Sequence, residues 1–371
     1  MQIRQLSIKG FKSLSSLIME DVSPLIVMAG PNGAGKSNLI DALVFLGAVV
    51  KRGAKQAIRE FGGFSQIHCF KHYTVNRTTI EFALKMRLQA RDYDYRLTLN
   101  NIDHTPQLVE HLKVDGEVMI ERSSGGSAHV RLDSSGELRA LDNYAPDMTA
   151  LMLLSQLPVY DYLTNIRVFR IDPAAAKEPD TSDTDATELH SHGRNVATML
   201  SVLEKDEHFR QQVLEWIGLI VPGMERVATE HQRRDGSTVI TFKEEGTKTL
   251  FPARLVSDGT MYALCILTAV LSRSRELGMT LIEEPERGLH PQAIGELIQL
   301  MRENAEAEHP IFLTTHSESV VRNTQPQELW LVAKEQGKTQ LRPVREAADL
   351  LDSIPLDKAW LTNLLDGGLP W

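Results

Sequence analysis

Eight residues near the start of the chain constrain its fold more than any other segment. The stretch GPNGAGKS, from Gly30 to Ser37, fits the pattern G-x-x-x-x-G-K-[ST]. The apolar run LIVMA precedes it, and Leu39, Leu43 and Leu46 follow it at the spacing of one helix face. A buried strand, a glycine-rich turn and an amphipathic helix are the context that this motif requires. Because strands buried on both faces are typical of parallel sheets, the sequence predicts an α/β fold.

The residues of this turn have the chemistry of a phosphate site. Glycines allow successive backbone N–H groups to converge on phosphate oxygens, and the helix N-terminus adds a favourable dipole. Lys36 is expected to reach the β- and γ-phosphates of a nucleotide, and the Ser37 hydroxyl to ligate Mg²⁺. The predicted nucleotide contacts in this turn are Gly30, Pro31, Asn32, Gly33, Ala34, Gly35, Lys36, Ser37 and Asn38.

Two later apolar runs end in polar residues that would complete such a site. MTLIEE ends at Glu283 and Glu284, and PIFLTTHS carries His316 at its end. The carboxyl ends of parallel strands present ligands at one edge of a sheet, so we expect these residues to meet the glycine-rich turn. Glu283 is predicted to bind Mg²⁺ and Glu284 to orient and deprotonate the attacking water. His316 is predicted to contact the γ-phosphate, with an ordinary structural histidine as the alternative.

A second helix start has the character of an anion site. In LVSDGTMYALCIL, residues 255–267, Asp258 and Gly259 precede a run of apolar residues. A helix start offers unpaired N–H groups and a partial positive charge, which suit a phosphate. An ordinary helix capped by Asp258 is the alternative. The residues alone do not identify the anion, because the chain already has a complete phosphate turn.

The intervening sequence predicts further parts of one large domain, residues 1–371. A period of two from about residue 79, with hairpin turns at Asp115-Gly116 and at residues 124–126, indicates an antiparallel β lobe over residues 76–145. A helical subdomain is predicted for residues 146–244, with a mobile loop at about 174–192 that is rich in Pro, Ala, Ser, Thr and Asp. Residues 1–75 and 245–335 would form the nucleotide-binding core, and residues 336–371 a C-terminal tail.

The motifs GPNGAGKS, SDG, IEEPERGLHP and TTHS, in this order, resemble the ABC-type ATPase heads of the SMC and RecF-like group. The chain is most similar to short, arm-less AAA-family or RecF-like ATPases, which are related to OLD proteins but lack their Toprim domain. IRQLSIKGFKSL, IRVFRIDP, HGRNVATML and WLTNLLDGGLPW extend the resemblance over nearly the whole chain. It implies a P-loop NTPase of the ABC/SMC-head type, with a mixed central sheet, an antiparallel β lobe and a helical subdomain.

The resemblance also implies an activity and an assembly. It implies ATP and Mg²⁺ as cofactors, ATP hydrolysis, and a homodimer that forms on ATP binding. Ser257, Asp258 and Gly259 match the signature of the group, whose serine and glycine cap the γ-phosphate of ATP bound to the opposite protomer. Pro285, Gly288 and Leu289 match the D-loop turn, which would lie against the partner head.

Two positions depart from the pattern of the group or match it poorly. Glu283 stands where the group usually has an aspartate, and its extra methylene implies a rearranged metal shell and slower hydrolysis. The Q-loop residue that would reach the metal is assigned to Gln66, with Gln56 as the alternative.

Composition and length bear on partners and location. A net charge of -9 argues against extensive nucleic-acid binding, although the basic stretch KRGAKQAIRE leaves a local DNA-binding face open. We therefore keep two hypotheses: a DNA-linked switch in repair, maintenance or antiviral defence, and a regulatory subunit of a separately encoded toxin or nuclease.

No nuclease activity is expected, because the segment after His316 is too short for a Toprim fold. The β lobe between the phosphate turn and the signature argues against a transporter ATPase.

The sequence also predicts a cytoplasmic protein without a membrane partner. It contains no apolar run of the roughly 18 residues that a membrane span requires. Its start alternates like a strand and does not resemble a signal peptide. The two cysteines, Cys69 and Cys265, lie far apart, which suits a reducing compartment.

Overall fold

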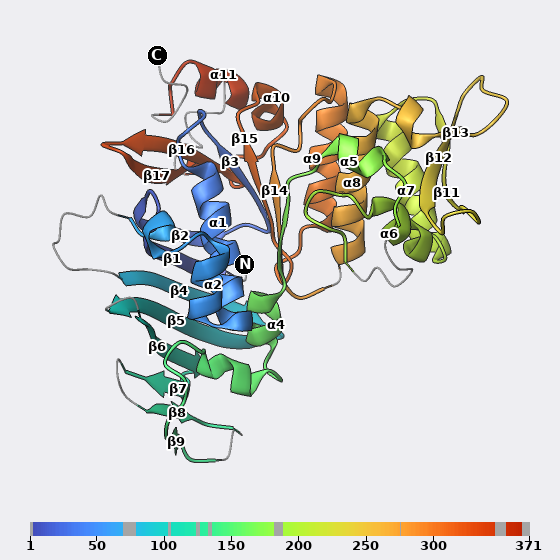
Figure 1. The fold of residues 1–371 in the computed structure, drawn as a ribbon. Helices are drawn as coiled ribbons and strands as arrows, with labels where there is room; N and C mark the ends of the chain where they lie inside the picture. Colours follow the sequence, from blue (N-terminus) through green and yellow to red (C-terminus); the bar gives the residue numbers. More distant parts are fainter. Residues whose placement is uncertain are drawn as a thin grey trace.

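The computed structural model describes residues 3–69, 79–102, 105–123, 127–132, 136–181, 188–274, 276–345 and 354–365. Figure 1 shows two large sheets on either side of helix α1 (Lys36–Arg52) and, beside them, a mostly helical lobe with a small third sheet. The predicted turn at residues 124–126, part of the predicted mobile loop (182–187), and parts of the tail (346–353 and 366–371) lie outside the described residues. Within the described ranges, no helix is both long and apolar enough to cross a membrane.

The central sheet is mixed, as the sequence predicted. Its order is β10-β14-β15-β3-β16-β17, and all strands are parallel except β17 at the edge. The bounds are β10 (Ile166–Phe169), β14 (Met279–Glu283), β15 (Ile311–Thr315), β3 (Leu25–Ala29), β16 (Leu329–Glu335) and β17 (Lys338–Pro343). Ile26 and Met28 of β3 enter the core that contains α1, whereas Val27 and Ala29 enter the core that contains α8 (Asp258–Arg273). Helices thus cover both faces, which explains why β3 is apolar throughout.

The second sheet is antiparallel and has eight strands in the order β2-β1-β4-β5-β6-β7-β8-β9. The bounds are β2 (Leu14–Val22), β1 (Ile3–Phe11), β4 (Thr79–Leu88), β5 (Arg91–Ile102), β6 (Thr105–Val114), β7 (Glu117–Arg122), β8 (Ala128–Val130) and β9 (Arg139–Leu141). The sequence predicts that residues 1–75 belong to the nucleotide-binding core, but β1 and β2 belong to this sheet: β2 pairs with β1, and β1 pairs with β4, with Leu6 opposite Leu84. Their alternation matches that of β4, so one shared face is buried against α1.

Two sequence predictions for this sheet are confirmed. The four apolar residues at alternate positions 80–86 of β4 are buried, as their period of two predicted. Asp115 and Gly116 form the turn between β6 and β7, with φ values of 51° and 86°. Two successive positive values are those of a type I′ turn, which fits the twist of the flanking strands.

Helices complete both parts of the molecule. Next to the antiparallel sheet lie α1, α2 (Ala54–Glu60), α3 (Phe64–Ile67), η1 (Ala150–Leu154) and α4 (Pro158–Thr164). The helical lobe and the C-terminal end contain α5 (Pro173–Lys177), α6 (Val196–Leu203), α7 (Glu207–Ile220), β11 (Met224–His231), β12 (Thr238–Glu244), β13 (Phe251–Pro252), η2 (Ala253–Leu255), α8, α9 (Pro291–Asn304), α10 (Glu318–Arg322) and α11 (Leu356–Leu361). Leu39, Leu43 and Leu46 of α1 are fully buried, as predicted. Residues 174–177 of the predicted loop belong to α5.

A buried carboxylate joins the antiparallel sheet to the helical segment that follows it. Glu110 of β6 is completely buried, and its oxygens accept hydrogen bonds from the Tyr95 hydroxyl at 3.0 Å and from the Ala150 and Leu151 N–H groups. Burial raises the pKa of Glu110 to about 7, although the hydrogen bonds to its carboxylate oppose the shift. The folded protein therefore keeps this proton at pH values where the unfolded chain has lost it.

The raised pKa of Glu110 predicts a pH-dependent stability. An unfolded glutamate titrates near 4.5, so between this value and about 7 the unfolded state binds fewer protons and folding weakens as pH rises. Between pH 5 and 8 the free energy of unfolding should fall by roughly 2–3 kcal/mol more in the wild type than in Glu110→Gln. Urea unfolding of both proteins at the two pH values measures this difference. Identical pH dependences would contradict the prediction.

Candidate functional site

The carboxyl ends of four neighbouring parallel strands meet at one edge of the central sheet. The register places Ala29 opposite Thr315 and Glu283 opposite Thr314. The glycine-rich turn, the Glu283-Glu284 pair and His316 therefore leave the sheet side by side, as the sequence predicted from the strand ends. β10 ends at the same edge, because it is parallel to β14 and in register with it.

The glycine-rich turn is held by the β16–β17 hairpin, a contact that the sequence did not predict. The Thr339 hydroxyl of β17 donates a 2.8 Å hydrogen bond to the carbonyl of Ala34. A Cβ atom on Gly30 would lie 2.1 Å from the carbonyl oxygen of Val332, and one on Gly35 would lie 2.0 Å from the Thr339 hydroxyl. Gly35 also has a left-handed φ of 104° at the start of α1. Both positions therefore require glycine.

The ammonium group of Lys36 lies against the glycine-rich turn. Lys36 is buried, and its ammonium group donates to the carbonyl oxygens of Gly30 at 2.7 Å and Pro31 at 3.0 Å. Burial lowers the pKa of Lys36, and the nearby carboxylates of Glu284, Glu286 and Glu283 act against that shift. Its positive charge thus lies over the turn, where phosphate oxygens would enter.

Asn38, by contrast, points away from the anion pocket of the turn. Its amide donates a 2.6 Å hydrogen bond to the hydroxyl of Ser13, which also lies 2.6 Å from that of Thr339. In the described structure this side chain ties α1 to the loop between β1 and β2. A nucleotide contact by its side chain stays a prediction.

Ser37 and Glu283 form the oxygen-rich part of the site. The Ser37 hydroxyl donates to Oε2 of Glu283 at 3.3 Å. Oε1 of the same carboxylate accepts from Nε and Nη2 of Arg170, at 2.9 and 2.7 Å. A hydroxyl and a carboxylate are ligands of the kind that Mg²⁺ prefers, and Mg²⁺ usually takes few protein ligands in addition to water and phosphate. These two residues therefore fit Mg²⁺, and Glu283 and Ser37 would hold it.

The proposed Q-loop residues do not meet this oxygen pair in the described structure. Gln66 lies exposed on α3 and makes no hydrogen bond to Ser37 or Glu283 among the described residues. The amide of Gln56 instead donates to Glu60 at 3.1 Å on α2. Arg170, which directly follows β10, is the residue that contacts the carboxylate.

Glu284 adopts a backbone conformation that is unusual for a residue with a side chain. Its φ is 50°, in the left-handed region, and the Tyr262 hydroxyl donates to its carbonyl oxygen at 2.9 Å. Its carboxylate lies 3.3 Å from Nδ1 of His316, and the two side chains are 41% and 47% exposed. The pair is therefore accessible to a substrate at the sheet edge. Backbone strain of this kind is frequent at functional sites.

A third carboxylate of the IEEPE segment was not singled out by the sequence analysis. Glu286 is 8% exposed, and its Oε1 accepts a 2.6 Å hydrogen bond from the Thr315 hydroxyl. Its Oε2 is buried and has no hydrogen-bond partner among the described residues. Burial raises the pKa of Glu286, and the hydrogen bond from Thr315 opposes this. The signal was present in the sequence, since a third acid follows the same strand end.

The signature residues begin helix α8 and do not contact the glycine-rich turn. Ser257, and not Asp258, caps the helix: its hydroxyl oxygen accepts the Thr260 N–H at 3.0 Å. Both Ser257 and Asp258 are exposed, and Lys177 of α5 donates to the Asp258 carboxylate at 2.5 Å. Among the described residues, none of the three signature positions forms a hydrogen bond or ion pair with residues 30–38.

The signature packs against the predicted D-loop turn of the same chain. A Cβ atom on Gly259 would lie 2.4 Å from the carbonyl oxygen of Gly288, so only glycine permits this close approach. Gly288 itself has a positive φ of 75°. The two segments predicted to face a partner are thus in contact with each other.

Comparison with known proteins finds relatives by sequence. The curated chromosome partition proteins Smc of Mycolicibacterium paratuberculosis and Mycobacterium leprae are each 40% identical to the chain, over 70 and 68 residues. These segments are 18% and 17% of this chain but only 6% of each relative, so the chain matches a small part of their length.

Three similar solved structures are SMC heads. An SMC head bound to the C-terminal winged-helix domain of ScpA has a TM-score of 0.61 at 15% identity, and covers 94% of this chain and 100% of that one. The SMC head domain of Thermotoga maritima has a TM-score of 0.52 at 15% identity, with 92% and 99% covered. An Smc head with an extended coiled coil, bound to the C-terminal domain of ScpA from Pyrococcus furiosus, has a TM-score of 0.58 at 15% identity, with 95% and 99% covered. At this identity the likeness shows the fold alone, which is the P-loop NTPase fold of SMC heads.

The family is shown by a match over most of the chain. The model of the family described as "AAA domain, putative AbiEii toxin, Type IV TA system" matches residues 25–322, which include the glycine-rich turn, the signature, Glu283, Glu284 and His316. The chain therefore belongs to this family of AAA ATPase domains.

Proposed function

We propose that the protein binds and hydrolyses ATP with Mg²⁺ in a head-to-head dimer that works as a nucleotide-controlled switch. The observation that carries the proposal is the separation of two phosphate-binding elements in one chain. One sheet edge brings together Lys36, Ser37, Glu283, Glu284 and His316. The exposed start of α8, by contrast, forms no hydrogen bond or ion pair with residues 30–38 among the described residues. Each chain thus supplies two different halves of a site.

The chemistry proposed for the sheet edge follows from the positions of the charged groups. Lys36 and the N–H groups of the turn bind the phosphates, and bound Mg²⁺ would neutralise phosphate charge next to Ser37 and Glu283. Glu284 accepts the proton of the attacking water, because its side chain is 41% exposed at the sheet edge where the phosphates would bind. His316 orients that carboxylate from the neighbouring strand end.

In the proposed dimer, the partner's signature supplies further hydrogen-bond donors to the γ-phosphate. The start of α8, a 16-residue helix, has the exposed residues Ser257 and Asp258 at its N-terminal end. This end carries a partial positive charge that favours an anion. In a two-fold dimer each signature would reach the γ-phosphate held by the turn of the partner, so that ATP joins the two protomers.

A mixing experiment tests this arrangement directly. Lys36→Ala removes the phosphate contact of the turn, and Ser257→Arg blocks the signature, so we expect each variant alone to lose ATP hydrolysis. In a mixed dimer, one composite site combines the intact turn of the Ser257→Arg chain with the intact signature of the Lys36→Ala chain. Mixing the two inactive variants should therefore restore a substantial part of the activity of one site. Steady-state phosphate release at increasing ratios of the variants measures the recovery.

The same experiment has a clear contrary outcome. If every catalytic group came from a single chain, no mixture would contain an intact site and the activity would stay at the level of the separate variants. A mixture of Lys36→Ala with Glu284→Gln is the matched control. Both changes lie in the same half of the site, and no mixed dimer contains a complete one.

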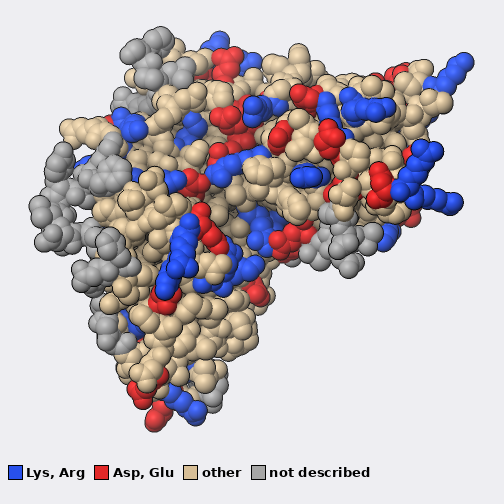
Figure 2. Space-filling model, viewed as in Figure 1, with Lys and Arg blue, Asp and Glu red and all other residues tan. Residues whose placement is uncertain are grey.

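The switch is proposed to act in DNA repair, DNA maintenance or antiviral defence. Support comes from relatives named chromosome partition proteins and from the exposed Lys51, Lys55 and Arg59 at the end of α1 and on α2. The second candidate is a regulatory ATPase subunit for a separately encoded toxin or nuclease. It is favoured by the toxin-system description of the family and by Figure 2, where basic and acidic side chains are interspersed on the face shown and form no continuous basic stripe among the described residues.

Salt dependence separates the two candidates. A DNA-linked switch should bind a short duplex more tightly with ATP, and lose that affinity steeply as the salt concentration rises. A regulatory subunit should instead bind its protein effector stably and show little affinity for the duplex. Fluorescence anisotropy of labelled DNA over a salt series measures the first property.

A further inference from the structure

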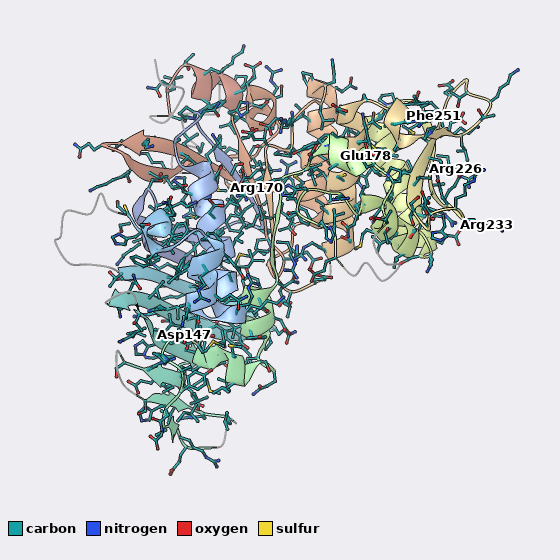
Figure 3. All side chains as sticks on the ribbon, in the orientation of Figure 1. Asp147, Arg170, Glu178, Arg226, Arg233 and Phe251 are labelled. Carbon is teal, nitrogen blue, oxygen red and sulfur yellow. The ribbon has the colours of Figure 1, made fainter. Side chains whose placement is uncertain are left out.

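We propose that Arg170 is a positioning residue for the metal-site carboxylate of Glu283, an inference that rests on the proposed Mg²⁺-dependent ATP hydrolysis. Arg170 directly follows β10, and Figure 3 labels it beside α1 near the centre of the molecule. Its Nε and Nη2 atoms both donate to Oε1 of Glu283, at 2.9 and 2.7 Å. Because β10 pairs in parallel with β14, the two residues leave the same sheet edge.

The two carboxylate oxygens of Glu283 have different partners. Oε1 is held by the guanidinium group, and Oε2 faces the Ser37 hydroxyl at 3.3 Å. A glutamate has one more rotatable bond than the aspartate that the family resemblance led us to expect at this position. The guanidinium group restricts that extra freedom and leaves Oε2 directed toward Ser37, where the metal would lie. Partners of metal-binding carboxylates commonly orient them in this way.

Arg170 is itself anchored from two sides. Its Nη2 atom donates to Oδ1 of Asp41 at 2.7 Å, and Oδ2 of Asp41 accepts from Lys12 at 2.6 Å. Asp41 lies one helical turn after Ser37 on α1, so the anchor belongs to the helix that carries the metal-site hydroxyl. The backbone N–H of Arg170 also donates to the carbonyl of Ser191 at 2.8 Å. The guanidinium group therefore joins the carboxylate to α1 in a fixed geometry.

A positioning role and a purely electrostatic role predict opposite results. A positive charge near the metal repels it, so its removal alone would tighten Mg²⁺ binding. Loss of orientation would weaken Mg²⁺ binding, typically by 10- to 100-fold for an outer partner of a metal ligand. Lysine retains the charge but not the planar fork, so Arg170→Lys separates the two effects.

The test measures the binding of a fluorescent, slowly hydrolysed ATP analogue at increasing Mg²⁺ and also in EDTA. For Arg170→Ala and Arg170→Lys, we expect the Mg²⁺ concentration at half-saturation to rise by about 10-fold or more, with affinity in EDTA unchanged within about twofold. Arg96→Ala is the matched control, because it breaks an exposed ion pair with Asp94 on the antiparallel sheet. It should leave both quantities at the wild-type level. Unchanged affinity in EDTA also shows that the variants are folded.

A double-mutant cycle makes the test specific for Glu283. In a Glu283→Asp background the shorter side chain loses its reach to Arg170, so the further change Arg170→Ala should alter the Mg²⁺ requirement by less than about threefold. Tighter or unchanged Mg²⁺ binding in Arg170→Ala would overturn the positioning role, and so would full rescue by Arg170→Lys. If the wild type binds no nucleotide with or without Mg²⁺, the proposed function fails as well.

Discussion

Replacing Glu284 by glutamine is expected to slow ATP hydrolysis by about 10²- to 10⁴-fold while ATP binding stays nearly unchanged. Glutamine has the same size and keeps a polar contact with His316, but it cannot accept a proton from water. The contact of Lys36 with the glycine-rich turn and the contact between Ser37 and Glu283 are not altered by the change. Because hydrolysis would normally end the dimer, the variant should accumulate as a dimer when ATP and Mg²⁺ are present. Mass photometry with and without ATP, together with single-turnover phosphate release, measures both effects.

The neighbouring acid Glu286 provides the matched control for this prediction. It lies two residues further along the chain but is buried against Thr315, whereas the Glu284 side chain is 41% exposed. Glu286→Gln should therefore reduce hydrolysis far less than Glu284→Gln and should not trap a dimer. A larger loss of hydrolysis in Glu286→Gln would mean that the buried acid is the base. A Glu284→Gln variant that stays monomeric with ATP would contradict the head-to-head dimer.

The sequence predicted those structural features that depend on the pattern of apolar and polar residues within one short segment. The apolar runs before Gly30 and Glu283 identified buried parallel strands, and parallel strands end at a common edge. His316 could be placed at this edge for the same reason, and its contact with Glu284 appears only in the structure. The period of two in β4 likewise predicted which side chains are buried. The apolar run or the alternation that marks a strand is a local property, so one sequence suffices for it.

The features that the sequence missed depend on pairings between distant segments. Nothing near residue 339 indicates that its hydroxyl supports a turn at residue 34. Arg170 follows a short strand, and its contact with Glu283 becomes apparent only because β10 lies beside β14. Tyr262 lies within an apolar run of the sequence, yet its hydroxyl donates a hydrogen bond to the backbone of Glu284. The strands β1 and β2 were grouped by their position in the chain, whereas pairing with β4 decides their sheet.

Removing the ammonium group of Lys36 by Lys36→Ala is expected to weaken ATP binding by about 100-fold or more, because hydrogen bonds to charged groups contribute roughly 1.5–3 kcal/mol each. In the described structure the group donates to the Gly30 and Pro31 carbonyls. An ATP phosphate entering the turn would give it a stronger, charged acceptor. Isothermal titration with ATP and Mg²⁺ measures the loss of affinity. ATP should raise the melting temperature of the wild type but not that of the variant.

Lys51→Ala is the control for this loss, because Lys51 is an exposed lysine in the last turn of the same helix. It removes the same charge from α1 at the end opposite to the glycine-rich turn, so ATP affinity should change by less than about twofold. Equal losses of affinity in the two variants would show that ATP binding depends only on the overall charge of α1. A selective loss in Lys36→Ala requires a phosphate within reach of its ammonium group, which places the nucleotide at the carboxyl edge of the central sheet.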